Sequence, residues 1–344
     1  MKRSTFATLG FSLVSLIPLT FAACGGSDSG DCTASGGTNS AQYVVNTVLV
    51  PSTSAKDYGI DLNGDTRVDN QLGQIIVTLA GQGLNVQDGV NQALMGGDLI
   101  LLLKESSTDA MFQSDSCAST TLQLGQKATM PDFSGMGHFT PDGTQMSSTF
   151  NGPVTGGKFN SAPPSTTTHP VTAGVTLPLV AGQTPVPIIL QGAHLQFTRS
   201  ASGMVTGGQL QGGIKSTDVQ LHIVPAVASL LTNKLQTDNP QTSTDMQIGS
   251  LFDTGGKADA SCSAGTCKNP TDGDGDAARK GMCATKGDKI IDVCEVSTNG
   301  LVTNLLAPDV QLFDSTGAYK PNKDNTMKDS LSVGLGFTAV GATF

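Results

Sequence analysis

Short runs of β-branched and aliphatic residues, separated by turn sequences, recur along most of the chain. The first run, at residues 41–51, predicts a strand because such residues fit a pleated, half-buried surface. From Leu99 to Leu103 the apolar residues are continuous, which predicts a strand buried on both faces. Similar runs predict strands at 120–124, 137–140, 146–150, 175–180, 188–198, 204–214, 310–313 and 331–337. So many short antiparallel candidates predict a mainly β protein, built as an antiparallel β-sandwich or a partly closed barrel.

Helical spacing of apolar residues interrupts these strands at several places. Positions three and four apart predict helices at 68–79, 85–94, 217–235, 245–253 and 301–306. The first of them is expected to end at Gly81, because glycine favours the end of a helix over its interior. Pro225 predicts either a kink in the third helix or a helix that begins at the proline.

The N-terminus has the pattern of an export signal. Lys2 and Arg3 precede an apolar run, residues 6–23, that is too short for a membrane span. The run ends at Phe21-Ala-Ala-Cys24, which resembles the lipobox of bacterial lipoproteins, where a cysteine after small residues is acylated and becomes the mature N-terminus. The alternative is ordinary signal cleavage nearby. An acylated Cys24 would hold the protein on a membrane, since each buried methylene contributes roughly 0.8 kcal/mol.

The mature chain is acidic. The full sequence has a formal net charge of −9, and loss of Lys2 and Arg3 with the leader changes it to −11. Phosphate binding needs clustered lysine and arginine, and the sequence has no such cluster. Nucleic acid is therefore not expected as a partner.

Six cysteines follow Cys24, namely Cys32, Cys117, Cys262, Cys267, Cys283 and Cys294. An even number in an exported chain predicts up to three disulfides. A bridge between Cys32 and Cys117 is attractive because it would leave the distal four to pair among themselves. A zinc site is the alternative for the last four cysteines. However, four, fifteen and ten residues intervene between successive members of this group, and these spacings match no common zinc knuckle.

Residues 61–72, Asp-Leu-Asn-Gly-Asp-Thr-Arg-Val-Asp-Asn-Gln-Leu, form the first motif that indicates chemistry. Oxygen-bearing side chains stand at positions 1, 3, 5 and 9, with an apolar residue at 8, which follows the ligand order of an EF-hand calcium loop. A hard divalent cation takes about six to eight oxygens, and alternate side chains on a tight loop can all point inward. The expected calcium ligands are Asp61, Asn63, Asp65, Arg67 and Asp69.

Two positions of this loop depart from the EF-hand pattern. Thr66 stands at position 6, where glycine allows the sharp turn, and Leu72 stands at position 12, where a bidentate acid belongs. The loop is therefore closer to the shorter aspartate loops of dockerins and thrombospondin type 3 repeats, with the missing ligand supplied by water or by a distant carboxylate. The alternative is an Asp/Asn/Gly turn whose side chains cap the following helix.

A second aspartate region spans residues 253–295. Phe252-Asp253-Thr-Gly resembles the start of an EF-hand loop, and Ile291 to Glu295 resembles its end. An insert that contains three cysteines separates the two parts. Our hypothesis is a split EF-hand with the weaker candidate ligands Asp253, Asp272, Asp274, Asp276, Asp292 and Glu295. The alternative is a surface excursion whose aspartates are solvated.

Three segments together resemble a group of uncharacterised Gram-negative surface lipoproteins with EF-hand-like segments. They are residues 61–73, residues 305–310 (Leu-Leu-Ala-Pro-Asp-Val) and residues 329–340 (Asp-Ser-Leu-Ser-Val-Gly-Leu-Gly-Phe-Thr-Ala-Val). The similarity covers most of the mature chain. It implies helical EF-hand-like segments beside the β fold and a location at the outer membrane, on the periplasmic or the cell-surface side. It implies no particular activity.

These observations divide the chain into six parts. They are a lipoprotein signal peptide (1–23), a flexible tether (24–40), the first strand with the calcium-type loop and two helices (41–97), a β-rich core with the helix near 217–235 (98–243), the split EF-hand-like segment with its disulfide-rich insert (244–307) and C-terminal strands that return to the core (308–344).

No zinc-protease helix, nucleophile elbow or phosphate loop occurs in the sequence, and the four histidines are scattered. We therefore expect a lipid-anchored envelope protein with a calcium-stabilised structural, adhesion or ligand-binding role, whose ligand would be a glycan or a protein. The alternative is a surface hydrolase with an Asp/Glu site and structural calcium, because carboxylate pairs leave no local signature in a sequence.

Overall fold

The computed structural model describes residue 32 and residues 37–81, 85–178, 185–237, 243–253, 290–291 and 293–344. The signal peptide, Cys24 and most of the expected tether lie outside these residues. Most of the insert in the second aspartate region, including Cys262, Cys267 and Cys283, also lies outside them.

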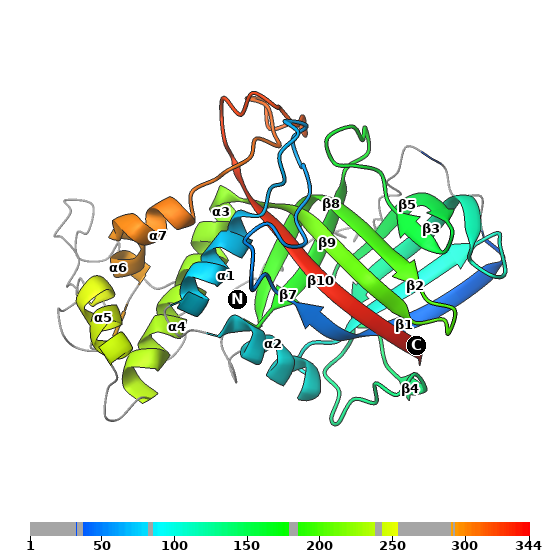
Figure 1. The fold of residues 1–344 in the computed structure, drawn as a ribbon, viewed down its shortest axis with the longest axis horizontal. Coiled ribbons are helices and arrows are strands. Elements are labelled where there is room, and N and C mark those ends of the chain that lie inside the picture. Colours follow the sequence, from blue (N-terminus) through cyan, green and yellow to red (C-terminus); the bar gives the residue numbers. More distant parts are fainter. Residues whose placement is uncertain are drawn as a thin grey trace, which may run out of the picture.

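Eight antiparallel strands form a closed barrel (Figure 1). In hydrogen-bonding order they are β1 (Asn39–Leu49), β2 (Leu101–Ser107), β3 (Ser114–Leu124), β5 (Ser147–Thr155), β6 (Lys158–Asn160), β8 (Val186–Arg199), β9 (Val205–Lys215) and β10 (Ser330–Thr343). Pairing of β10 with β1 closes the ring. Two further strands extend it: β7 (Val171–Leu177) pairs with β8, and β4 (Gly137–His138) pairs with the end of β10. The expected mainly β fold is confirmed. The architecture is a barrel, and it is closed, whereas the sequence predicted a sandwich or a partly closed barrel.

The continuous apolar run at the start of β2 is buried on both faces, as its sequence predicts. Leu101 and Leu103 belong to the main core inside the barrel. Ile100 and Leu102 pack outside the barrel, in a small cluster that includes Phe139. Alternate side chains of a strand point to opposite faces, so one run supplies both layers.

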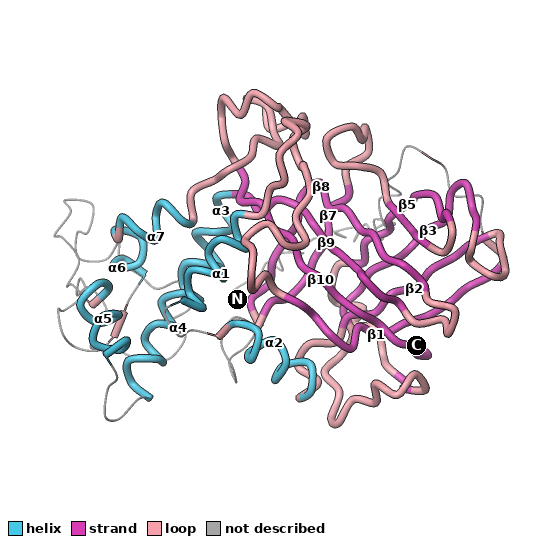
Figure 2. The backbone as a smooth tube through the Cα atoms, viewed as in Figure 1, coloured by secondary structure: helices cyan, strands magenta, loops and turns pink. Residues whose placement is uncertain are grey.

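Helices gather at one end of the barrel (Figure 2). They are α1 (Gln71–Gly81), α2 (Val86–Met95), α3 (Ser216–Asp218), the π-helix η1 (Val219–Ile223), α4 (Val224–Thr237), α5 (Ser243–Phe252), α6 (Val293–Thr298) and α7 (Gly300–Leu305). Helix α1 contacts β10 and α2 contacts β1. Helical backbone runs without a break from Ser216 to Thr237, and Pro225 lies where the π-helix passes into α4, so the proline coincides with a change of helix type and not with the start of a helix. Among the residues that the structure describes, none of the helices has the length and apolar character to cross a bilayer.

The prediction of a strand at residues 310–313 is wrong. This segment makes only isolated β-bridges. The Asp329 carboxylate accepts hydrogen bonds from the backbone amides of Leu312 (3.2 Å) and Phe313 (2.9 Å). A side chain therefore satisfies two donors that a neighbouring strand would otherwise pair, and the hydrophobic pattern cannot reveal this.

Cys32 and Cys117 form a disulfide, with an S–S distance of 2.07 Å and a Cα–Cα distance of 5.9 Å. The pairing favoured by the sequence is confirmed. The bridge ties the segment before β1 to β3. The other four cysteines, or in the case of Cys294 its side chain, fall outside the described part of the chain.

Candidate metal centre

Residues 60–69 form a closed loop between β1 and α1. The backbone amide of Asp69 donates to the carbonyl of Ile60 at 2.9 Å, which joins the two ends of the loop. Leu62 is fully buried in a small core with two residues of the 310–313 segment. The loop is therefore fixed against the chain that leads into β10.

Asp61 organises the turn. One of its carboxylate oxygens accepts hydrogen bonds from the amides of Gly64 (2.6 Å) and Asp65 (3.2 Å), and the other accepts from Thr66 (2.8 Å). Gly64 and Thr66 both have positive φ, at 86° and 70°. Thr66 stands where EF-hand loops use glycine, and it adopts a left-handed conformation despite its side chain. The departure at position 6 therefore does not prevent the tight turn.

Three carboxylates of the loop converge. Asp61, Asp65 and Asp69 each place one oxygen within 4.8 Å of the others, and all three side chains are half-buried. Negative charges this close repel one another unless protons or a cation neutralise them. The cluster could hold a metal ion, and its carboxylate oxygens suit a hard cation.

The repulsion is most evident at Asp69. Burial, and then the negative charges of Asp309, Asp65 and Asp61, raise the pKa of Asp69 to about 7. A hydrogen bond from the backbone amide of Leu62 (2.9 Å) opposes this rise without cancelling it. A bound cation would favour the ionised carboxylate, so this site is electrostatically prepared for positive charge.

A fourth carboxylate, that of Asp309, influences the cluster from outside the loop. Its carboxylate accepts a hydrogen bond from the amide of Ser332 (2.7 Å), and burial raises its pKa. Its negative charge acts on Asp69, although Asp309 does not belong to the group of carboxylates whose oxygens lie within 4.8 Å of one another. Spacing within the loop could not reveal it, because Asp309 lies near the other end of the chain.

The remaining loop positions divide into possible donors and core residues. Asn63 is 3% exposed; its side-chain oxygen accepts from the Asp65 amide (3.2 Å), and its Nδ2 has no partner among the described residues. Arg67 is exposed, and since its guanidinium is a cation only its main-chain carbonyl could bind a metal. Leu72 at position 12 is buried in the main core, where it supports α1 instead of supplying a ligand.

The sequence offered a second interpretation of this turn, in which a side chain caps the following helix, and Asn70 is the residue that caps α1. Its side-chain oxygen accepts from the amide of Gly73 in α1 (3.0 Å) and from the amide of Gly334 in β10 (3.1 Å). Its Nδ2 donates to the carbonyls of Asp57 (2.8 Å) and Gly334 (3.1 Å). Asn70 therefore joins the loop, the helix and the closing strand, while Asp61 and Asp65 accept from amides of the loop itself.

The second aspartate region is described only at its two ends. Helices α5 and α6 flank it, and both lie against α4. Asp253 and Glu295 are 6% and 1% exposed, so these two do not fit the alternative of solvated surface residues. The helix expected at 301–306 is α7, which Asn299 caps by accepting from the amides of Leu301 and Val302. Asp272, Asp274, Asp276 and Asp292 lie outside the described residues, so the split EF-hand stays a prediction.

Fold and site together define an eight-stranded β-barrel with an acidic loop that could hold a metal ion. No protein-family model matches the chain, and no curated protein or solved structure shows a significant match. The function is therefore argued from the loop and the barrel themselves.

Proposed function

We propose that this chain is a lipid-anchored envelope protein whose barrel is stabilised by calcium in the 60–69 loop, and that it serves as a structural or binding module. The observation that carries the calcium proposal is the convergence of Asp61, Asp65 and Asp69. A calcium ion there would offset most of the negative charge of the three carboxylates and would stabilise the folded loop.

The donor set favours calcium over other common metals. Zinc prefers nitrogen and sulfur ligands, and magnesium demands near-octahedral geometry and usually keeps several waters. Calcium accepts about six to eight oxygens in flexible geometry. We expect the Asn63 side-chain oxygen and the Arg67 carbonyl, which belong to the same loop, to add to the three carboxylates.

Two observations support export and lipid anchoring. The Cys32–Cys117 disulfide suits an oxidising compartment, and the sequence around Cys24 suits acylation. Outside the cytosol, extracellular calcium modules work with dissociation constants of roughly 0.1–1 mM. We place the protein at the outer membrane, held there by its N-terminal lipid, with a glycan or a protein as the partner of its exposed surface.

The anchor is tested by mass spectrometry of the mature N-terminus together with membrane fractionation. The wild-type chain is expected to begin at an acylated Cys24 and to sediment with membranes. Cys24→Ala is expected to leave the protein in the soluble fraction. An unmodified mature N-terminus in the wild-type protein would refute the anchor.

The barrel interior supports a binding module over a hydrolase. Its cavity is lined almost entirely by leucine, valine and phenylalanine side chains, with Thr176 as the one hydroxyl of the lining. A carboxylate hydrolase needs two acidic groups that face one cleft. Among the described residues, the carboxyls with raised pKa are Asp69 in the metal cluster, Asp309, which accepts hydrogen bonds from Ser332, and Glu105, which pairs with Arg199.

The calcium proposal is tested by thermal unfolding with calcium and with chelator. The wild-type protein is expected to unfold at a higher temperature in calcium, and the double variant Asp61→Asn, Asp65→Asn is expected to lose most of that gain. Asp314→Asn is the matched control, since Asp314 also accepts from amides of its own turn but is not in the cluster. Equal calcium effects in all three proteins would refute the proposal.

A further inference from the structure

Three hairpins form the end of the barrel that lies away from the helices (Figure 2). Their turns are residues 108–113 between β2 and β3, 156–157 between β5 and β6, and 200–204 between β8 and β9. The Gly157 amide donates to the carbonyl of Gln113 at 3.1 Å, and the Arg199 amide donates to the carbonyl of Gly157 at 2.8 Å. The three turns are therefore joined into one surface, which we call the hairpin face.

Two methionines project from the hairpin face. Met111 is 73% exposed and Met204 is 44% exposed. The turn that carries Met111 is fixed, because the Asp109 carboxylate accepts hydrogen bonds from three amides of this turn at 2.8–2.9 Å. Phe112 is buried, and its ring centre lies 3.9 Å from the guanidinium carbon of Arg199. The backbone thus holds Met111 in the solvent while its neighbour packs inward.

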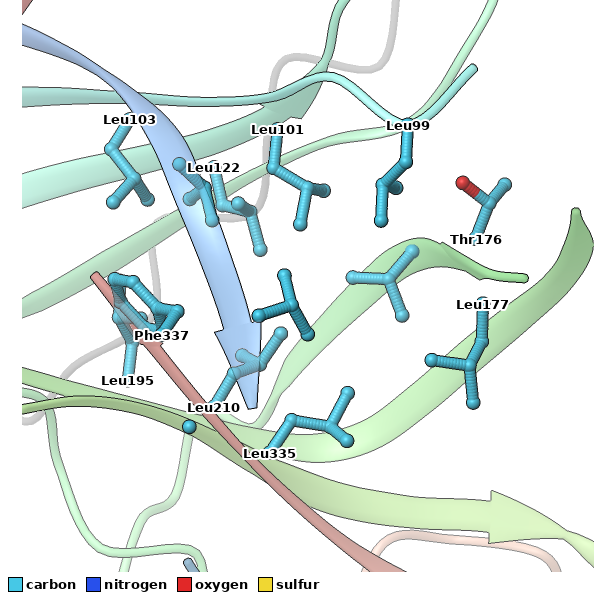
Figure 3. A pocket seen from close by; sticks show the side chains of 14 residues that line it. Leu99, Leu101, Leu103, Leu122, Thr176, Leu177, Leu195, Leu210, Leu335 and Phe337 are labelled. Atoms are coloured by element: carbon cyan, nitrogen blue, oxygen red, sulfur yellow. The ribbon is translucent and has the colours of Figure 1, made fainter. Parts of the chain in front are cut away.

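The barrel interior has no room for these methionines. Leucine and valine side chains from opposite walls of the barrel point toward one another (Figure 3), and the cavity between them measures about 30 Å³. A space of this size holds about two water molecules. The methionine side chains therefore remain available to an apolar partner outside the barrel.

The hairpin face has no net formal charge, in contrast to the chain as a whole. Residues 107–116, 156–158 and 198–204 contain two acids and two bases, namely Asp109, Asp115, Lys158 and Arg199. Both carboxylates accept hydrogen bonds from amides of the 108–113 turn. The full sequence has a formal net charge of −9, so the excess of negative charge lies elsewhere. An anionic bilayer surface would therefore repel this face less than it repels the rest of the protein.

The Cys32–Cys117 disulfide limits how far this face can lie from an acylated Cys24. Cys117 is close to the start of β3, beside the 108–113 turn, so the bridge holds Cys32 at the same end of the barrel. The eight residue steps from Cys24 to Cys32 span at most about 28 Å when fully extended. Without the bridge, the fifteen steps from Cys24 to Asn39 at the start of β1 would allow about 50 Å.

We propose that the hairpin face rests on the bilayer that holds the lipid, with Met111 and Met204 in the headgroup region and the helices directed away from the membrane. This inference rests on the proposed lipid anchor: the anchor supplies the affinity, and the hairpin face supplies the orientation. The short tether brings this end of the barrel to the bilayer, and the methionines exchange contact with water for contact with lipid. The helical end then faces any partner of the protein.

Tryptophan fluorescence of the acylated, full-length protein in vesicles tests this proposal, because the natural chain has no tryptophan. Met111→Trp and Met204→Trp each place a single reporter on the hairpin face. Met327→Trp is the matched control. Met327 is 51% exposed, but it lies just before β10, whose first residue, Ser330, pairs with Lys215 next to α3. The vesicles contain phosphatidylglycerol and phosphatidylcholine, and bromine on the phosphatidylcholine acyl chains quenches a tryptophan that enters the bilayer.

Brominated vesicles, compared with unbrominated ones, are expected to lower the fluorescence of Met111→Trp and Met204→Trp at least about twofold and to leave Met327→Trp unchanged, since a surface contact buries apolar groups only about 5–10 Å deep. All three methionines are exposed, so tryptophan at these positions leaves the core intact, which thermal unfolding checks.

Cosedimentation with the vesicles separates this proposal from the proposed anchor. Variants that sediment with the vesicles, but in which Met111→Trp and Met204→Trp are quenched no more than Met327→Trp, overturn the orientation and leave the anchor intact. A natural chain that does not sediment with the vesicles overturns the anchor and the orientation together.

Discussion

Replacement of Asp69 by asparagine is expected to stabilise the metal-free protein and to weaken its response to calcium. In the folded, metal-free chain, burial and the neighbouring carboxylates raise the pKa of Asp69 from 3.8 to about 7. The folded state therefore holds this proton more tightly than the unfolded state does. The resulting stabilisation is fully present below about pH 4 and is lost as the pH rises through about 7. Asparagine has no such charge, and its side-chain oxygen can still accept from the Leu62 amide.

The magnitude follows from the size of the shift. A rise from 3.8 to about 7 corresponds to a ceiling of about 4 kcal/mol, at about 1.36 kcal/mol per pKa unit. Asp69 is only half-buried, so solvent screens part of this energy. We therefore expect the free energy of unfolding of Asp69→Asn to exceed that of the wild-type protein by roughly 1–2 kcal/mol at about pH 8 without metal.

Urea unfolding in chelator and in calcium, at about pH 5 and about pH 8, provides the assay. In chelator the advantage of Asp69→Asn should shrink at the lower pH, where Asp69 is largely protonated in the folded state. In calcium at the higher pH the order should reverse, because the wild-type carboxylate binds the ion. A variant that is less stable than the wild-type protein in chelator at about pH 8, or that gains as much from calcium, would refute the reasoning.

Four further predictions concern the stability of the fold and can be measured by chemical denaturation. Thr66→Gly should stabilise the protein by roughly 0.5–1 kcal/mol, because it relieves a left-handed backbone conformation; a loss of stability would show that the Thr66 side chain makes a needed contact. Asn70→Ala should cost about 2–3 kcal/mol, since four hydrogen bonds that join the loop, α1 and β10 are lost. Asn85→Ala, at the N-cap of α2, should lower the free energy of unfolding by less than about 0.5 kcal/mol, because the Asn85 side chain makes no capping hydrogen bond. If Asn70→Ala and Asn85→Ala cost the same, the hydrogen bonds of Asn70 do not stabilise the fold as described. Serine at both Cys32 and Cys117 should lower stability by about 3–4 kcal/mol in non-reducing buffer, and an unchanged denaturation midpoint would contradict a stabilising bridge.

Strands and helices could be predicted from the sequence where the pattern of neighbouring residues determines them. The apolar run at 99–103 produces a strand buried on both faces because it meets the barrel core on one side and a separate cluster on the other. The closure of the barrel was not predictable, because a sandwich and a barrel both bury one face of each strand. The choice depends on the pairing of β1 with β10, whose partners, such as Val48 and Phe337, are far apart in the sequence.

The candidate site shows the same division. The spacing of the loop is a local pattern, and of its five predicted ligands the carboxylates of Asp61, Asp65 and Asp69 converge. Asp309 influences Asp69 through tertiary structure, so no spacing rule within the loop identifies it. The strand predicted at 310–313 failed for a related reason, since a distant aspartate took over its backbone donors.

Calorimetric titration of the metal-free protein with calcium tests the central claim most directly, with the wild-type chain and the Asp61→Asn, Asp65→Asn variant side by side. The account predicts a saturable binding event in the wild-type protein that the variant loses. Titration curves that are the same for both proteins, or the absence of any binding heat together with unchanged thermal unfolding in calcium, would contradict it.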